Sequence, residues 1–275
     1  LSIGVVVNDM SELDVDGLLV TQTEFFEKND RSFQSIYSCV LSSKKGLKKL
    51  SDSLNQIMQT RTPELLIIET SGSCHPMPLI EFFRTQQPFK LTGVLTLVDS
   101  AMIDQDYDCG KQLVPTMQRN AQNQQRDTTN LLVEQIMFCS HLVLTKVDRI
   151  KKNKLPEIAQ SIHEINPFVS IVSVPWGNLS IDDVLAMPEY DFHRVAQLIK
   201  ELKPAFDSER DDDQPYNLVA NVIKDDRPFH PQRLWDTCQQ HLGQHIYRSK
   251  CFLYLPNRDK LSLLWNQAAS GINLE

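Results

Sequence analysis

Five short runs of mostly apolar residues constrain the fold of this chain more than any other feature. They cover residues Ile3–Val7, Leu65–Ile68, Val94–Val98, Leu142–Leu144 and Val169–Val174. The runs are nearly continuous in apolar residues rather than alternating, which is typical of parallel strands that helices cover on both faces. Helical patterns separate the runs. We therefore predict an α/β fold built on a doubly wound, mostly parallel sheet.

The helical segments can be placed by their apolar spacing. One apolar stripe consists of Leu47, Leu50, Leu54, Ile57 and Met58. Further helices are predicted around Leu131–Ile136, at Pro156–Ile165 and at Phe192–Leu202. Asp127 or Thr128 is the expected N-cap of the helix around Leu131, because a short polar side chain there can accept a backbone N–H.

The composition changes after Lys203. Residues 203–215 are rich in acids, including the run Asp211–Asp213, and we predict a linker there. This divides the chain into domains at 1–202 and 216–275. In the second, smaller domain we predict a strand at Tyr216–Ile223, a helix at Pro231–Leu242 and a strand at Cys251–Leu255. Leu234, Trp235 and Cys238 are expected to point inward from that helix, giving a small α+β unit.

The charge and the cysteines exclude several classes of protein. The formal net charge of −7 argues against nucleic-acid binding, which requires a basic surface. No apolar run approaches the roughly 20 residues that span a bilayer, so we expect no membrane segment. The six cysteines include no CxxC pair. That pattern indicates reduced, mostly buried thiols and a cytoplasmic protein.

Polar residues follow the predicted strands at the point where each one ends. They are Asn8-Asp9, Glu69-Thr70-Ser71-Gly72, Asp99 and Thr145-Lys146-Val147-Asp148. In open parallel sheets the carboxyl ends of the strands form the ligand site. Together these residues predict a nucleotide site.

The residues Thr145–Asp148 indicate which base is bound. A carboxylate at Asp148 can accept two hydrogen bonds from the edge of guanine, whereas adenine offers no such pair of donors. The methylenes of Lys146 would lie over the base plane. The alternative is that Asp148 simply caps a helix.

Glu69 and Gly72 indicate where the phosphates would lie. Glu69 ends an apolar strand, where a carboxylate can meet the magnesium ion of a triphosphate, usually through water. Gly72 would let the backbone approach the terminal phosphate. The alternative is a strand-end acid beside a turn glycine.

The sequence resembles the CobW family of P-loop GTPases, which includes zinc and cobalt metallochaperones. The matching stretches are VNDMSELDVDG (7–17), ETSG (69–72), LTGVLTLVDS (91–100), LLVEQIMFCSHLVLTKVD (131–148) and RPFHPQRLWD (227–236), followed by YRSKCFLYL and LWNQAASGINLE. They cover nearly the whole chain in family order. The resemblance implies a P-loop GTPase-like domain followed by a CobW C-terminal domain that we expect to be partial in this chain, with GTP and Mg²⁺ as ligands and a client metalloprotein as partner.

The resemblance also implies roles for individual residues. Glu69 and Gly72 match the catalytic ExxG motif, and Thr145, Lys146 and Asp148 match the guanine-reading motif. Asp9 and Glu12 lie in the segment that matches the first switch, where their carboxylates would approach magnesium or the carried metal.

The chain departs from the family in two places that matter for activity. It contains nine glycines and no GxxxxGK[ST] pattern, so the phosphate-binding loop and the strand before it are missing from this sequence. We therefore expect this chain by itself not to hydrolyse GTP. The family's Cys-x-Cys-Cys metal motif should fall near Ser38–Ser43, where only Cys39 is present. Cys74 and His75 are candidate replacement ligands for zinc, against the alternative of a buried thiol and a helix-start histidine.

Three hypotheses about function follow. In the first, the intact protein hydrolyses GTP to deliver a metal, expected to be zinc, to a client protein. In the second, the chain is a degenerate, non-catalytic member that acts through protein contacts. A third, ranked below both, is a nickel-handling GTPase, and the RPFHP segment argues against it.

Overall fold

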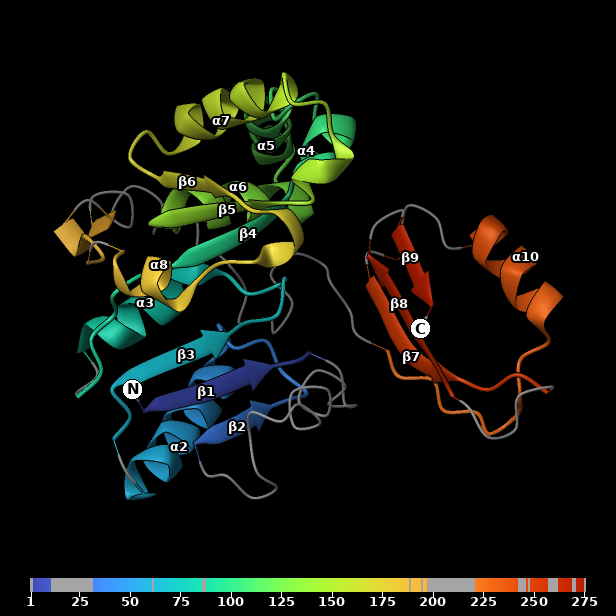
Figure 1. The fold of residues 1–275 in the computed structure, drawn as a ribbon, viewed down its shortest axis with the longest axis horizontal. Helices are drawn as coiled ribbons and strands as arrows, with labels where there is room; N and C mark the ends of the chain where they lie inside the picture. The colour runs from blue at the N-terminus through green and yellow to red at the C-terminus, as the bar shows by residue number, and fades with distance from the viewer. Residues whose placement is uncertain are drawn as a thin grey trace. The chain divides into compact units, whose positions relative to one another are not determined.

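The computed structural model describes residues 2–10, 32–60, 62–85, 88–187, 189–193, 195–196, 221–241, 246, 248–256, 262–268 and 271–274. These residues form two compact units, one within residues 2–196 and one within residues 221–274 (Figure 1). Glu12, the predicted linker at 203–215 and the predicted domain boundary at residue 202 lie outside the described residues. None of the helices in the described ranges is long and apolar enough to cross a membrane.

The first unit is built on parallel strands, as the apolar runs predict. Strands β1 (Ile3–Asn8), β2 (Phe33–Ile36) and β3 (Leu65–Glu69) form a sheet in the order β2-β1-β3. Strands β4 (Leu95–Asp99), β5 (His141–Thr145) and β6 (Ser170–Ser173) form a second sheet in the order β4-β5-β6. All four strand pairs in these sheets are parallel. The α/β prediction is confirmed, but the strands form two three-stranded sheets instead of one.

Helices follow nearly every strand and cover the sheets. In the first unit they are α2 (Lys44–Thr60), α3 (Pro76–Thr85), α4 (Ser100–Asp106), α5 (Leu113–Gln122), α6 (Thr128–Phe138), α7 (Lys154–Ile165) and α8 (Ile181–Leu185), with short 3₁₀ turns η1 (Val147–Arg149) and η2 (Pro175–Gly177). Helix α2 lies beside the first sheet, and α4, α5 and α7 gather beside the second (Figure 1).

Helix α6 begins where the sequence predicts. Asp127 is its N-cap, and the Asp127 carboxylate accepts from the backbone N–H groups of Thr129 at 2.8 Å and Asn130 at 3.2 Å. The Asn130 side chain accepts in return from the Asp127 N–H, which completes a capping box. The N-cap prediction is therefore confirmed at Asp127.

Each sheet has its own core, and a third cluster joins the two halves. Leu50, Leu54 and Ile57 of α2 pack with Val6 of β1 in the first core. The second core contains buried residues of α4, α6, α7 and β5. Between them, Ile80 of α3 packs with Phe138 of α6 and with Tyr190, whose hydroxyl donates to the Phe138 carbonyl at 2.8 Å. This third cluster fixes α3, and the first sheet with it, against α6.

Strands β3 and β4 are edge strands with one hydrogen-bonded neighbour each in the described structure. Both carry a large apolar side chain that stays accessible, with Ile67 41% and Leu97 67% exposed. Unpaired backbone groups beside exposed apolar side chains favour pairing with another chain. The edges at β3 and β4 therefore favour self-association.

The second unit is a three-stranded antiparallel sheet with one helix. Helix α10 (Pro231–His241) accompanies strands β7 (Arg248–Leu253), β8 (Leu263–Ala268) and β9 (Gly271–Leu274), in the order β7-β8-β9. Its core contains Cys238, Leu253 and Trp265.

One expectation for the second unit was wrong, and another is tested only in part. Trp235 is 56% exposed instead of inward, because only the Leu234 and Cys238 side of α10 packs against the sheet core. Of the predicted strand at Tyr216–Ile223, the described residues 221–223 form no strand, and the remainder lies outside the described residues.

Candidate functional site

The carboxyl ends of β1 and β3 bring together the first group of predicted residues. Glu69 is the last residue of β3 and pairs in register with Val7 of β1. Asp9 follows β1 directly, and its N–H donates to the Ile36 carbonyl at 3.0 Å. Glu69 and Gly72 are exposed, whereas Ser71 between them is buried. The carboxyl ends of these strands therefore present carboxylates beside an accessible turn.

Asn8 organises the carboxyl ends of these strands, although the sequence predicted it only as one of the strand-end polar residues and gave it no role of its own. Its side chain is 3% exposed, and its Nδ2 donates to the carbonyls of Ile36 and Cys39 at 3.0 Å each. Its Oδ1 accepts from the Ser71 N–H at 3.5 Å. One buried amide thus ties the ends of β1 and β2 to the turn after β3. The sequence signal was an amide at the end of an apolar run.

The second group lies at the ends of β4 and β5. Thr145 ends β5, and its hydroxyl donates to the Val98 carbonyl at 3.2 Å. Lys146 follows in the left-handed region, with φ of 53°, a conformation that costs a non-glycine residue energy and often marks functional turns. The turn η1 then presents Asp148, which is exposed. This geometry leaves the Asp148 carboxylate accessible to a ligand.

Lys146 pairs with Asp99, the acid at the end of the neighbouring strand. Its Nζ lies 2.6 Å from Asp99 Oδ2, while Asp99 Oδ1 accepts from the N–H groups of Ala101 and Met102 at the start of α4. Burial raises the pKa of Asp99, but the hydrogen bonds from Lys146 and these N–H groups outweigh it and hold the pKa below its ordinary value. The predicted placement of the Lys146 stem over a base stays a prediction.

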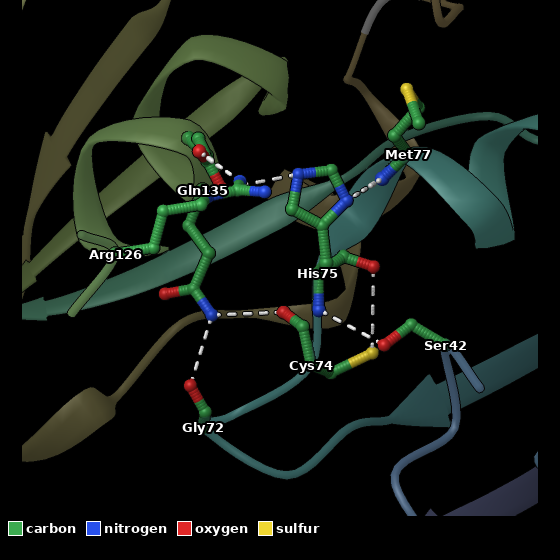
Figure 2. A network of polar contacts seen from close by, with 8 residues as sticks. Ser42, Gly72, Cys74, His75, Met77, Arg126 and Gln135 are labelled. Atoms are coloured by element: carbon green, nitrogen blue, oxygen red, sulfur yellow. Dashed lines mark hydrogen bonds and ion pairs between the residues drawn. The ribbon is translucent and has the colours of Figure 1, made fainter. Parts of the chain in front are cut away.

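Helix α6 holds the turn that follows β3 (Figure 2). Gln135 Nε2 donates to the carbonyls of Gly72 at 3.0 Å and Cys74 at 3.1 Å. The neighbouring Glu134 is 3% exposed and has its Oε2 3.2 Å from His75 Nε2. Arg126 also pairs with Glu134. The turn after β3 is thereby fastened to the helix that leads into β5.

The predicted metal ligands do not gather into a site. No three side chains of His, Cys, Asp or Glu within the described residues are placed to hold an ion. Burial raises the pKa of Cys74 from 9.0 to about 11, so that this thiol stays protonated, although zinc binds the thiolate. The Cys39 thiol is directed at the Tyr37 carbonyl, 3.7 Å away. A role for these cysteines in metal binding stays a prediction.

His75 is held at both ring nitrogens. Its Nδ1 accepts from the Met77 N–H at 3.2 Å, and its Nε2 faces Glu134. A metal could reach either nitrogen only after one of these contacts is broken. The conformation described here therefore does not fit His75 as a zinc ligand.

His230, in the RPFHP segment, has a structural position. It is exposed and immediately precedes α10, where its Nδ1 accepts from the Arg233 N–H at 3.5 Å and its carbonyl accepts from the Leu234 N–H at 2.9 Å. These bonds satisfy donors of the first helical turn, as a cap does.

Two family models match the chain. The model of the CobW/HypB/UreG nucleotide-binding domain matches residues 1–173. The model of the C-terminal domain of the cobalamin synthesis protein CobW matches residues 218–275.

Curated relatives and one solved structure are also similar. Zinc-regulated GTPase metalloprotein activator 1 of Dictyostelium discoideum is 24% identical over 98% of this chain and 60% of its own length. The zinc chaperone CobW of Pseudomonas aeruginosa is 23% identical over 67% of this chain and 52% of its own length. The chain thus spans 60% or less of these relatives. The crystal structure of Zn(II)-bound YjiA GTPase from E. coli aligns over 100% of this chain and 88% of its own, with 16% identity and a TM-score of 0.40.

The matched segments include every predicted nucleotide-site residue and extend over both units. The chain therefore belongs to the CobW/HypB/UreG family of nucleotide-binding domains and carries the CobW C-terminal domain.

Proposed function

We propose that this chain is the guanine-nucleotide-binding part of a CobW-type GTPase that couples the nucleotide to delivery of zinc to client metalloproteins. The observation that carries the proposal is the accessible Asp148 carboxylate, presented by the left-handed turn at Lys146 directly after β5. The names of the relatives, a zinc-regulated GTPase activator and a zinc chaperone, support the metal and the clients. Nucleotide binding is assigned to residues 1–202, with 216–275 as the C-terminal domain.

The proposed roles follow from the chemistry of the exposed groups. Asp148 accepts the two N–H groups on the guanine edge, and Thr145 and Lys146 shape the turn that holds it. Glu69 lies where it would meet a magnesium ion through water when a triphosphate is bound. Gly72 would lie beside the terminal phosphate. Magnesium, when bound, supplies charge neutralisation at the phosphate oxygens.

For the isolated chain we propose that it binds the guanine nucleotide and does not hydrolyse GTP. No GxxxxGK[ST] loop is present in this sequence to hold the phosphates. We therefore expect phosphate release from GTP at background level. Magnesium-dependent turnover that Asp148→Ala abolishes would refute this part of the proposal.

Calorimetric titration of the chain with GDP, ADP and xanthosine diphosphate tests the base assignment. We expect GDP to bind in preference to ADP, and Asp148→Asn to weaken GDP binding by roughly a hundredfold, since two charge-assisted hydrogen bonds are lost or reversed. Asn also presents a donor, which suits the C2 carbonyl of xanthine, so binding of xanthosine diphosphate should improve. Asp182→Asn, at an exposed acid of α8, is the matched control. Equal affinity of the wild-type chain for GDP and ADP would refute guanine recognition.

A further inference from the structure

The turn after β3 is fastened to α6 by a single side-chain amide. Gln135 Nε2 donates to two backbone carbonyls, Gly72 at 3.0 Å and Cys74 at 3.1 Å (Figure 2). Both partners are acceptors, so the donating atom must be the amide nitrogen. Because Gln135 is 63 residues away from Gly72 in sequence, no local pattern sets this contact. It fixes the orientation of the peptide plane between Gly72 and Ser73.

Helix α6 is a rigid support for that amide. Its first turn is closed by the Asp127 capping box. At its other end, the side chain of Asn166 is 3% exposed and its Nδ2 donates to the carbonyls of Ile136 at 2.8 Å and Cys139 at 3.0 Å. Strand β5 begins two residues after Cys139 and ends at Thr145. The Gly72 peptide is thus held by the same element that places the base-reading turn.

The turn is also held from the first sheet. The Ser71 N–H donates to Asn8 Oδ1 at 3.5 Å, and the His75 N–H donates to Ser42 Oγ at 3.2 Å. Gly72 lies between these anchors and remains exposed. Its flanking residues are therefore fixed on two sides, while the position that a Cβ would take on Gly72 faces open space.

Neither packing nor backbone conformation explains a glycine at position 72. A Cβ placed there would meet nothing within 4 Å, and Gly72 is not among the residues with positive φ. Close approach of a ligand to the backbone is a physical reason for glycine that does not depend on packing or on a positive φ. The terminal phosphate of a nucleotide bound at the carboxyl ends of the strands is a ligand of that kind.

We propose that Gln135 is a positioning residue that presets the Gly72 peptide for the terminal phosphate of GTP. The inference rests on the proposed function, because it requires a guanine nucleotide at the carboxyl ends of the strands. Gln135 acts through Gly72 and does not touch the nucleotide. Its loss should therefore weaken recognition of the third phosphate and leave recognition of guanine unchanged.

The experiment compares the affinity of the 275-residue chain for GDP and for the slowly hydrolysed analogue GTPγS, by titration calorimetry with Mg²⁺. Gln135→Met keeps the length of the side chain and removes both N–H donors, and Gln135→Glu removes the donors while keeping the shape. Gln160→Met, at an exposed glutamine of α7, is the matched control. We expect Gln135→Met to bind GTPγS roughly three- to tenfold more weakly, the effect of one or two neutral hydrogen bonds, with GDP affinity unchanged. Gln135→Glu should weaken GTPγS binding at least as much, because its carboxylate would face the two carbonyl oxygens.

The ratio of the two affinities separates positioning from general destabilisation. A variant that is merely less well folded would bind both nucleotides more weakly and leave the ratio unchanged, which would overturn the inference. Amide hydrogen exchange gives a second readout: Cys74 and His75 should exchange faster in Gln135→Met, while peptides of α7 stay protected as in the wild type. Unchanged exchange at Cys74 and His75 would also overturn it.

The titrations also separate failure of the proposed function from failure of the role of Gln135. If the wild-type chain binds neither GDP nor GTPγS, guanine-nucleotide binding itself is refuted, and the phosphate role of Gln135 with it. If the wild-type chain binds both and Gln135→Met keeps the wild-type ratio, only the role of Gln135 is refuted.

Discussion

Replacing Asn8 by aspartate should destabilise the first unit strongly and in a pH-dependent way. The substitution keeps the shape of the side chain but replaces an NH₂ group that donates to Ile36 and Cys39 at 3.0 Å each. Two hydrogen bonds are lost, each worth about 1 kcal/mol. A carboxylate that is 3% exposed would also face two carbonyl oxygens, so we expect a total loss of roughly 3–5 kcal/mol in the free energy of unfolding at pH 8.

The sign of the pH dependence follows from the position of the new acid. Burial and the two carbonyls would raise the pKa of the introduced carboxyl in the folded state above its unfolded value. The penalty is therefore fully present above the folded pKa and fades as the pH falls through it, because the protonated acid is neutral and can donate to one carbonyl. The loss relative to wild type should accordingly be smaller at pH 5 than at pH 8.

Urea denaturation followed by circular dichroism at the two pH values measures this difference. Hydrogen exchange of β1 peptides identifies the unfolding of the first unit. Asn153→Asp is the matched control: Asn153 is exposed and makes no side-chain cap hydrogen bond, so its replacement should change stability by no more than about 0.5 kcal/mol. A stability of Asn8→Asp within that margin at pH 8, or a penalty that grows on acidification, would refute the role assigned to Asn8.

Three further outcomes are expected. In the native chain Cys74 should react with iodoacetamide at pH 8 more slowly than Cys39, because burial raises the Cys74 pKa to about 11 while Cys39 is partly exposed. Mass spectrometry measures the two rates, whose difference should shrink in urea. Equal rates in the native chain would contradict the prediction. Ile67→Lys or Leu97→Lys should slow self-association, measured by light scattering, because each substitution places a charge on an edge strand. The control Phe168→Lys should have less effect, since Phe168 is 72% exposed but lies outside these strands. Lys146→Met should cost less than about 1 kcal/mol at pH 7, because its pair with Asp99 is partly exposed. That loss should fade as the pH falls from the ordinary carboxyl pKa of 3.8 through the lowered pKa of Asp99 in the folded state, where Asp99 gains its proton. A loss that stays the same on acidification would argue against the pair.

Much of the fold could be predicted because local patterns carry the signal. The apolar runs placed five of the six parallel strands to within a residue or so, and missed β2, whose four residues Phe33–Ile36 include two polar ones. The stripe from Leu47 to Met58 placed α2 within its observed bounds. An alternation of strands and helices is encoded in spacing along the chain, so it can be read without knowing which strands become neighbours.

The site was predicted by residue type but not by its contacts. Glu69, Thr145 and Asp148 were expected at strand ends and lie there. The pairing of Lys146 with Asp99 was not foreseen, because it depends on which strand lies next to β5. The contact of His75 with Glu134 was missed because His75 lies in the turn before α3 and Glu134 lies in α6, far apart in sequence.

The sequence by itself determined the elements, their order and the acids and amides at their ends, because hydrophobic period and turn chemistry act over a few residues. Only the tertiary structure decided that the strands form two sheets, and that Asn8 and Gln135 hold the turn containing Gly72 from opposite sides. Those contacts join residues 63 apart in sequence. The bond from Asn8 exists only once β1 pairs with β3, and the bond from Gln135 only once α3 packs against α6.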